Sequence, residues 1–394
     1  MPQKVLLVIT AFFFVFCLVQ LWMIQLERVD KAARLECTLS PDKTKHPQEN
    51  VQTVDRKHKF VLIHTSSRTG SSFTGEFFSQ NPKAYYLFEP LKLLSLIPNS
   101  YIEGEYLQGQ VAELLLSLFR CDYSQIFRES YKLNPSDDKL RDQWMKKIFE
   151  QTLARNKEST TNKNNLTQSF LEQQCRQYDV RVIKTIRCAH FNTLLPLILK
   201  HNVYVINLIR DPRAKAISRI EIEAQIASQD LTSYISDPDR FNQLVSITRQ
   251  ECVKLQDTVT FVNRVSSSIH VDDITRLSRV VRYEDIAVAP LELYRKIYSF
   301  LEVSASPEVE KWIGESTKGD EGGLFSTKRD SRAAVERWRG KLPFPLVTRM
   351  QDISECARVL KVLGYKSTTS EKELKNFNIS FVSETNAFKR FKIV

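Results

Sequence analysis

The chain has 394 residues, enough for one large or two ordinary domains, and its 42% hydrophobic and 26% charged content is that of a globular protein rather than a disordered one. Its formal net charge of +11 indicates anionic partners. Nucleic acid is disfavoured as that partner, because the sequence holds no zinc-finger, helix-turn-helix or RNA-binding signature.

The N-terminal region contains an apolar run. Residues 5–24 are interrupted only by Thr10 and Gln20, and a run of this length is what a membrane-spanning helix needs. A cleaved signal peptide is the alternative, but the run is long for one and no small-x-small cleavage site follows. We therefore predict an uncleaved signal anchor, with residues 1–4 as a cytoplasmic tail and the polar residues 25–58 as a stem.

Orientation in the membrane is decided by weaker signals. Basic residues flank both ends of the apolar run, so the positive-inside rule does not choose a direction. Two N-x-S/T sequons, at Asn165 and Asn378, favour a lumenal position for the main domain, residues 59–394.

Six of the seven cysteines lie outside the apolar run and permit up to three disulfides in an oxidising compartment. Their pairing cannot be read from the sequence, since six cysteines allow about 15 pairings. No C-x-x-C occurs and the spacings are wide, so no zinc or other metal site is expected. The six are Cys37, Cys121, Cys175, Cys188, Cys252 and Cys356.

The first element of the main domain has the pattern of an anion site. The apolar residues 60–64 are typical of a buried strand, the small polar residues 65–72 of a loop, and a helical pattern follows. Such a tight turn directs backbone N–H groups and a helix N-terminus at one point. Gly70 lets the backbone approach a ligand closely, and Arg68 adds a fixed positive charge. The loop lacks the Gly-Lys-Ser/Thr of a nucleoside-triphosphate P-loop, which argues against a P-loop kinase.

A second strand end has similar chemistry. Residues 203–209 predict a buried strand, Arg210 ends it, and a helix carrying Ser218 follows over residues 213–227. An ion pair from Arg210 to Asp211 or Asp285 is the alternative use of that arginine. Two anion-binding strand ends in one domain predict a ligand with two separated anionic groups.

The remaining pattern alternates strands and helices. This predicts an α/β fold in which a mostly parallel sheet has helices on both faces, with ligands at the carboxyl ends of the strands. Residues 156–168 are expected to form an exposed loop. The further strands are expected at residues 84–88, 180–186 and 279–283, and the further helices at residues 110–119, 241–264, 290–301 and 346–363, the last ended by Gly364.

From about residue 59 to its end, the chain resembles the Golgi carbohydrate 6-O-sulfotransferases. Arg68-Thr-Gly-Ser-Ser-Phe73 resembles the loop that binds the 5′-phosphosulfate of PAPS (3′-phosphoadenosine 5′-phosphosulfate). Leu208-Ile-Arg-Asp-Pro-Arg-Ala214, with Ser218, resembles the 3′-phosphate site. Residues 370–380 are most similar to the keratan sulfate galactose 6-sulfotransferases, followed by the chondroitin 6-sulfotransferases. Residues 86–91, 120–123, 281–285 and 326–339 also match.

This resemblance implies a P-loop-like sulfotransferase fold and transfer of a sulfuryl group from PAPS, without a metal, to the 6-hydroxyl of galactose or N-acetylgalactosamine. N-acetylglucosamine is the alternative acceptor sugar. It also implies a glycan partner of keratan or chondroitin type, a single-pass type II Golgi membrane protein, and allows a homodimer. The residues expected to bind PAPS are Arg68, Thr69, Gly70, Ser71, Ser72, Phe73, Arg210, Ser218, Tyr283 and Arg329.

Two residues are expected to act in catalysis. Arg68, a permanent cation, would stabilise charge on the leaving group. Glu89 follows a predicted strand and lies between Phe88 and Pro90, so we expect burial to raise its pKa and make it the general base. Its structural alternatives are an ion pair with Arg68 or a helix cap.

For several other residues the sequence allows more than one role. His64 and His190 are rival bases, although His64 fits a core position. Lys184 and Arg187 end another strand at the same edge and are candidates for binding the acceptor or PAPS. Tyr283 fits a core position as well as it fits a place near the adenosine, and the basic stretch 326–339 fits a solvated loop as well as a segment over PAPS.

Two other classes of protein share features with this sequence. Asp237-Pro-Asp239 resembles the Asp-x-Asp motif of a lumenal glycosyltransferase, but it lies in a polar segment broken by proline, with no buried strand before it. A non-catalytic glycan-binding protein is the second class, and it is disfavoured because Arg68, Glu89 and Arg210 are all present.

Overall fold

The computed structural model describes residues 58–93, 105–130, 138–150, 167–188, 191–317 and 330–384. The predicted membrane segment and stem lie outside these ranges. Within them, no helix combines the length and the apolar character needed to cross a membrane.

The centre of the fold is a five-stranded sheet in the order β2-β3-β1-β4-β5, and every neighbouring pair is parallel. Every residue of β3 and β4 is buried, as expected for parallel strands covered on both faces. The predicted mostly parallel sheet is confirmed. The strands are β1 (Lys59–Thr65), β2 (Ala84–Phe88), β3 (Val180–Thr185), β4 (Tyr204–Ile209) and β5 (Ser278–Arg282).

Helices connect the strands and cover the sheet. Short 3-10 helices occur at η1 (Pro90–Lys92) and η5 (Phe191–Leu194). The α-helices are α2 (Ser71–Ser79), α3 (Glu105–Phe119), α4 (Ser124–Ser130), α5 (Asp138–Ile148), α7 (Gln168–Arg176), α8 (Leu195–His201), α9 (Pro212–Ile226), α10 (Leu231–Ser236), α11 (Pro238–Ser266), α12 (Val271–Leu277), α13 (Tyr283–Val288), α14 (Pro290–Phe300), α15 (Pro307–Ser316), α16 (Ser331–Lys341), α17 (Phe344–Gln351), α18 (Ser354–Leu363) and α19 (Glu371–Leu374).

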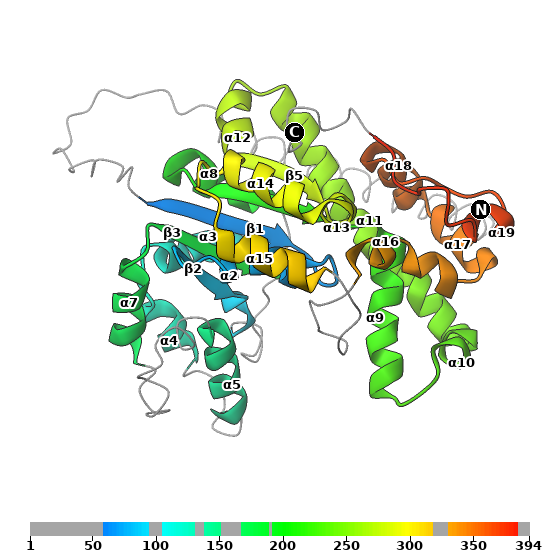
Figure 1. The fold of residues 1–394 in the computed structure, drawn as a ribbon, viewed down its shortest axis with the longest axis horizontal. Helices are drawn as coiled ribbons and strands as arrows, with labels where there is room; N and C mark the ends of the chain where they lie inside the picture. The colour runs from blue at the N-terminus through cyan, green and yellow to red at the C-terminus, as the bar shows by residue number, and fades with distance from the viewer. Residues whose placement is uncertain are drawn as a thin grey trace, which may run out of the picture. The chain divides into compact units, whose positions relative to one another are not determined.

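The covering helices form two groups. In the first group, α15 contacts both α2 and α14. Helices α14 and α15 lie in front of the sheet in Figure 1. Helices α3, α8, α11 and α12 form the second set of mutual contacts, together with η5. Because β1 is the central strand, the loop that follows it lies between elements from both halves of the chain.

A second core cluster lies away from the sheet, beneath α9, α10, α16 and α17. It explains one wrong prediction. The single helix expected over residues 346–363 is two helices, α17 and α18, because Leu346, Val347 and Met350 pack into the second cluster whereas Val359 and Leu363 pack into the main core. The predicted Gly364 cap is confirmed, with a left-handed φ of 77°.

Two disulfides join segments that are distant in sequence. Cys121 is bonded to Cys175, which ties the end of α3 to α7, and Cys252 is bonded to Cys356, which ties α11 to α18. Cys37 lies outside the described residues.

The last part of the described chain has little regular structure and is held by main-chain contacts. Arg339 is fully buried, and its guanidinium donates to the backbone carbonyls of Leu374, Asn376 and Ile379 at 2.9, 2.6 and 2.8 Å. Lys375 reaches back and donates to the carbonyl of Arg339 at 2.8 Å. The stretch that fitted a solvated basic loop therefore includes a buried anchor.

Candidate active site

The loop between β1 and α2 has the geometry of an anion site. Gly70 caps α2 with a left-handed φ of 77°, and no side chain among the described residues bonds to the free N–H groups of that helix end. A Cβ at Gly70 would lie 2.1 Å from Cδ2 of Tyr283, so the ring leaves room only for glycine. Backbone donors of α2 therefore remain available to a ligand.

Side chains inside the loop fix its shape. The hydroxyl of Thr69 donates to the carbonyl of Ser66 at 2.7 Å, and that of Thr65 donates to the carbonyl of Leu208 on β4 at 2.8 Å. Thr69 is buried, so its side chain shapes the loop from within. Arg68 takes a left-handed φ of 63°, a conformation found at strained ligand-binding positions.

The other predicted residues of this loop differ in exposure. Ser72 is exposed at the start of α2, whereas Ser71 is buried. Phe73 is also buried and packs against Phe77 and Trp312, with ring centroids 5.4 and 5.5 Å apart. Its side chain belongs to the core, and what it offers a ligand is its backbone N–H in the first turn of α2.

The second predicted anion site adjoins the first. Arg210 donates from Nη1 to the carbonyl of Arg68 at 2.9 Å, and Nε of Arg68 donates to the hydroxyl of Ser218 at 3.0 Å. The guanidinium of Arg210 also lies 4.5 Å from the ring centre of Tyr283. The structure thus brings together the predicted residues Arg68, Gly70, Arg210, Ser218 and Tyr283.

Neither alternative ion pair of Arg210 is formed. Asp211 is bound by Arg213, and Asp285 is bound by Arg282 at 2.9 Å. Nε of Arg210 is buried and has no hydrogen-bond partner among the described residues. A buried donor without a partner is the feature expected where an anionic ligand completes the site.

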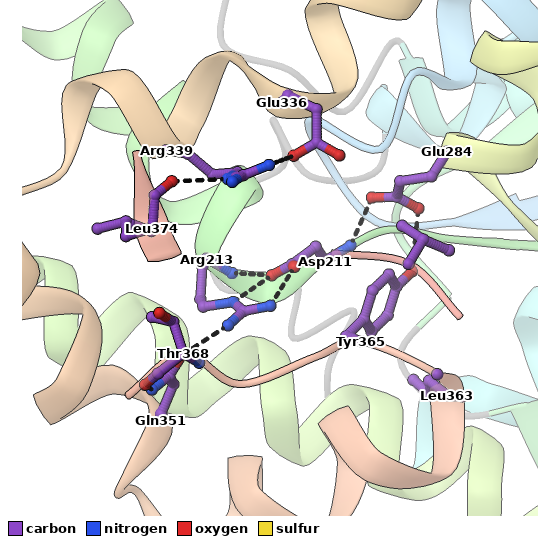
Figure 2. Close-up of polar contacts among 12 residues, drawn as sticks. Asp211, Arg213, Glu284, Glu336, Arg339, Gln351, Leu363, Tyr365, Thr368 and Leu374 are labelled. Carbon is purple, nitrogen blue, oxygen red and sulfur yellow. Dashed lines mark hydrogen bonds and ion pairs between the residues drawn. The ribbon is translucent and has the colours of Figure 1, made fainter. Parts of the chain in front are cut away.

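A buried polar network supports this site from behind, and Figure 2 shows it. Asp211 accepts from the backbone N–H of Arg213 at 2.9 Å and from its guanidinium at 2.7 Å, which caps α9. Arg213 in turn donates to Gln351 at 2.9 Å, and Gln351 donates to the carbonyl of Thr368 at 3.0 Å. Arg213 lies in the motif that resembles the 3′-phosphate site, but its guanidinium is bound to Asp211 and Gln351.

Glu284 is the second carboxyl of the network. Its Oε1 accepts from the backbone N–H of Asp211 at 3.0 Å, and its Oε2 accepts from the hydroxyl of Tyr365 at 3.1 Å. Burial raises the pKa of Glu284 to about 7, although Arg210 acts in the opposite direction. The start of α9 is thus linked to the C-terminal segment through a group that titrates near neutrality.

Glu89 lies at the carboxyl end of β2 with a left-handed φ of 47°. Its carboxylate is buried and bound by Lys184 and by Arg187, the latter at 2.5 Å. The predicted rise in its pKa is wrong. Burial acts to raise the pKa, but Lys184 and Arg187 outweigh burial and lower it. Lys184 lies on the neighbouring strand β3 and Arg187 just after it; both were expected at this sheet edge, but as ligand-binding residues rather than as partners of Glu89. Glu89 therefore pairs with Lys184 and Arg187, and not with Arg68, the ion-pair partner expected if Glu89 had a structural role.

His64 is a core residue. Its Nε2 lies 3.0 Å from the carbonyl of Cys188 and its Nδ1 lies 3.1 Å from the side chain of Asn207. Burial lowers the pKa of His64, although its contacts with Cys188 and Asn207 act in the opposite direction. The rival base His190 and the predicted PAPS ligand Arg329 lie outside the described residues.

The segment that resembles an Asp-x-Asp motif has a structural role. Asp237 caps α11, and its carboxylate accepts from the backbone N–H of Asp239 at 2.7 Å. Across the part of the chain that the structure describes, no three His, Cys, Asp or Glu side chains are placed to share a metal ion.

Comparison with known proteins identifies the family. The family model described as the sulfotransferase domain matches residues 58–377. Carbohydrate sulfotransferase 1 of Danio rerio is 31% identical over 374 residues, which cover 86% of this chain and 85% of that protein. The chain belongs to the carbohydrate sulfotransferase family. Carbohydrate sulfotransferase 3 of Mus musculus is 28% identical to this carbohydrate sulfotransferase over 368 residues, covering 87% of this chain and 75% of that protein.

Among solved structures, the sulfotransferase domain of the Synechococcus PCC 7002 olefin synthase is similar, with a TM-score of 0.39 and 18% identity over 79% of this chain and 97% of that one. Membership of the family makes this carbohydrate sulfotransferase a PAPS-dependent enzyme. The residues present fit such a donor, because the buried Nε of Arg210 and the uncapped start of α2 are donors for anionic groups.

Proposed function

We propose that this carbohydrate sulfotransferase transfers a sulfuryl group from PAPS to the 6-hydroxyl of galactose in keratan-type chains. N-acetylgalactosamine in chondroitin is the next candidate and N-acetylglucosamine the third. The similarity of residues 370–380 to the keratan sulfate galactose 6-sulfotransferases favours galactose. Both carbohydrate sulfotransferases 1 and 3 are among the relatives, which supports a glycan acceptor without choosing the sugar.

The donor would lie across the two anion sites. PAPS supplies the sulfuryl group and leaves as a bisphosphate. Arg68 and the N–H groups at the start of α2 are assigned to the 5′ end, where negative charge develops on the leaving oxygen. Arg210 and Ser218 are assigned to the 3′-phosphate. The observation that carries this assignment is the direct contact between the sites, since Arg68 bonds to both Arg210 and Ser218.

Glu89 is assigned as the group that accepts the proton of the attacking hydroxyl. The lowered pKa leaves its carboxylate ionised at neutral pH but makes it a weaker base than a raised pKa would, so the assignment rests on its position at the carboxyl end of β2. Lys184 and Arg187 hold the carboxylate in one orientation. One strand, β3, separates the ends of β2 and β1, so Glu89 lies about 10 Å from the donor loop along the carboxyl edge of the sheet.

The setting proposed for this reaction is the Golgi lumen, with residues 5–24 as a type II membrane anchor. The disulfides Cys121–Cys175 and Cys252–Cys356 support an oxidising compartment. The sequon residue Asn378 is exposed, as an acceptor for N-glycosylation must be.

The proposal is tested with the purified full-length chain, labelled PAPS and separate keratan, chondroitin and desulfated heparan acceptors, without added metal. We expect label at O6 of keratan galactose. Glu89→Gln should lower kcat by about 100-fold or more, the usual contribution of general base catalysis. Arg210→Ala should chiefly raise KM for PAPS.

Glu150→Gln is the matched control, because Glu150 is an exposed carboxylate. Label mainly on chondroitin would keep the enzyme and change the acceptor sugar. An unchanged kcat in Glu89→Gln would remove Glu89 from the chemistry.

A further inference from the structure

Lys215 is a buried cation that the donor site described above does not use. It lies on α9 with only 3% of its side chain exposed, and its ammonium forms an ion pair with Glu251 of α11. Glu251 is 7% exposed and has a second, more distant partner, Lys254, at 3.4 Å. Burying both charges is costly, and two apolar side chains would join α9 to α11 at least as well.

The ammonium of Lys215 makes one further contact that an apolar side chain could not make. It donates to the hydroxyl of Ser66, which is the first residue after the end of β1. The hydroxyl of Ser66 also lies 3.4 Å from Glu251, and its carbonyl accepts from Thr69. Lys215 and Glu251 therefore hold the beginning of the loop that ends at Gly70.

The same helix holds the middle of the loop. Ser218 lies three residues after Lys215, on the same side of α9, and binds Nε of Arg68. Arg210, just before α9, binds the carbonyl of Arg68. The shape of the loop is thus set from α9 at two places, Ser66 and Arg68.

Other charged groups act on the same ammonium. Burial lowers the pKa of Lys215 to about 8; Glu251 opposes this, while Lys254 and Arg210 add to it. The pKa of Glu251 is lowered, because its lysine neighbours outweigh the effect of burial. At neutral pH both members of the pair are charged, and Lys215 is a full donor to Ser66.

We propose that Lys215 and Glu251 are a positioning pair for the donor loop. The ammonium fixes Ser66, so that the loop presents Arg68 and the start of α2 to the 5′-phosphosulfate group. In this role the pair acts through Ser66 and not through a contact with PAPS or the acceptor. This inference rests on the proposed assignment of the loop to the 5′ end of PAPS.

The test compares two nucleotides that differ only at the 5′ end. Binding of adenosine 3′,5′-bisphosphate and of adenosine 3′-phosphate is measured by calorimetry on the full-length chain. We expect Lys215→Met to weaken the bisphosphate about tenfold, as loss of a hydrogen bond to a charged group does, and to leave adenosine 3′-phosphate unchanged. KM for PAPS should rise by the same factor, and Lys215→Arg should restore most of the loss.

Two further variants keep the result interpretable. Lys296→Met is the matched control, since it removes an exposed lysine of α14 that pairs with Glu292, and it should bind both nucleotides as the unmodified chain does. Lys215→Met combined with Glu251→Gln removes the stranded buried carboxylate, and is used if the single variant does not fold. It should show the same selective loss.

The outcomes distinguish failure of the positioning role from failure of the donor assignment. Equal weakening of both nucleotides by Lys215→Met would overturn the positioning role, because it would mean general damage to the site. Unchanged binding of the bisphosphate would overturn it as well. If the unmodified chain binds neither nucleotide, the donor assignment itself is wrong, and the positioning role is refuted together with it.

Discussion

Replacing Gly70 by alanine tests the geometry of the donor loop most directly. The new Cβ would lie 2.1 Å from Cδ2 and 2.3 Å from Cε2 of Tyr283, far inside contact distance. The residue would also keep a left-handed φ of 77°. The second effect alone costs about 1–2 kcal/mol for a residue with a Cβ. Displacing the buried ring adds about 1–3 kcal/mol, the usual cost of overpacking.

We therefore expect Gly70→Ala to lower the free energy of unfolding by about 2–5 kcal/mol. Binding of adenosine 3′,5′-bisphosphate should fall as well, because the displaced ring of Tyr283 lies 4.5 Å from the guanidinium of Arg210. Thermal unfolding followed by circular dichroism measures the first effect, and calorimetric titration the second. Gly314→Ala is the control, since nothing lies within 4 Å of a Cβ there. In a helix it should stabilise by about 0.5–1 kcal/mol.

A double-mutant cycle divides the cost between its two causes. In a Tyr283→Ala background the clash is absent, and Gly70→Ala should cost only the part due to backbone conformation. An equal cost in both backgrounds would show that the ring does not restrict this position. Unfolding and nucleotide binding indistinguishable from those of the unmodified chain would refute the whole account of the loop.

Two further predictions concern stability. The pKa of Glu284 is about 7 in the folded chain, against 4.5 for an unperturbed glutamate. Between these two pH values the folded chain therefore holds a proton on Glu284 that the unfolded chain has lost. The free energy of unfolding should then fall by up to about 3 kcal/mol as pH rises through that window. Glu284→Gln should remove this slope in urea titrations at pH 5 and 8, and an unchanged slope would contradict the assignment. Replacing Cys252 and Cys356 by alanine should cost about 2–4 kcal/mol. Replacing Cys121 and Cys175 should cost roughly 0.6 kcal/mol less, because that bond closes a segment of 54 rather than 104 residues and so removes less entropy from the unfolded chain. Equal or reversed costs in denaturant unfolding would show that the entropy of the closed segment does not set the difference.

Features that depend on local sequence could be predicted. The strand, loop and helix around Gly70 follow from an apolar run, small polar residues and a left-handed position within a few residues of one another. The parallel sheet followed from alternating strand and helix patterns, and all its strands were located to within a residue or so. The contact between Arg68, Arg210 and Ser218 was expected only in general terms, as two anion sites at one sheet edge.

Features that depend on distant partners could not be predicted. The pKa of Glu89 is lowered because Lys184 and Arg187, almost a hundred residues away, reach its carboxylate. Burial alone was visible in the flanking apolar residues, and it pointed in the opposite direction. An arginine in a sequence is normally expected at the surface, so the burial of Arg213 in the first turn of α9 could not be predicted either.

The break between α17 and α18 has the same origin. Residues 346–363 have a nearly continuous helical pattern, and the pattern does not reveal that its two halves serve different cores. The disulfide from Cys356 to Cys252 then fixes α18 against α11. Sequence periodicity identifies which residues are buried, but not which of two clusters they join.

The anchor formed by Arg339 has a consequence for how the C-terminal segment can evolve. Its guanidinium recognises carbonyl oxygens of the main chain, which every amino acid possesses. The exposed side chain of Ile379 can therefore diverge between relatives while the segment keeps its path. Deleting the segment would have a larger effect, because the fully buried guanidinium of Arg339 would keep Glu336 but lose its carbonyl acceptors. Shortening this tail should therefore cost more than substituting an exposed residue within it, so tolerance of such a substitution is poor evidence that the tail is dispensable.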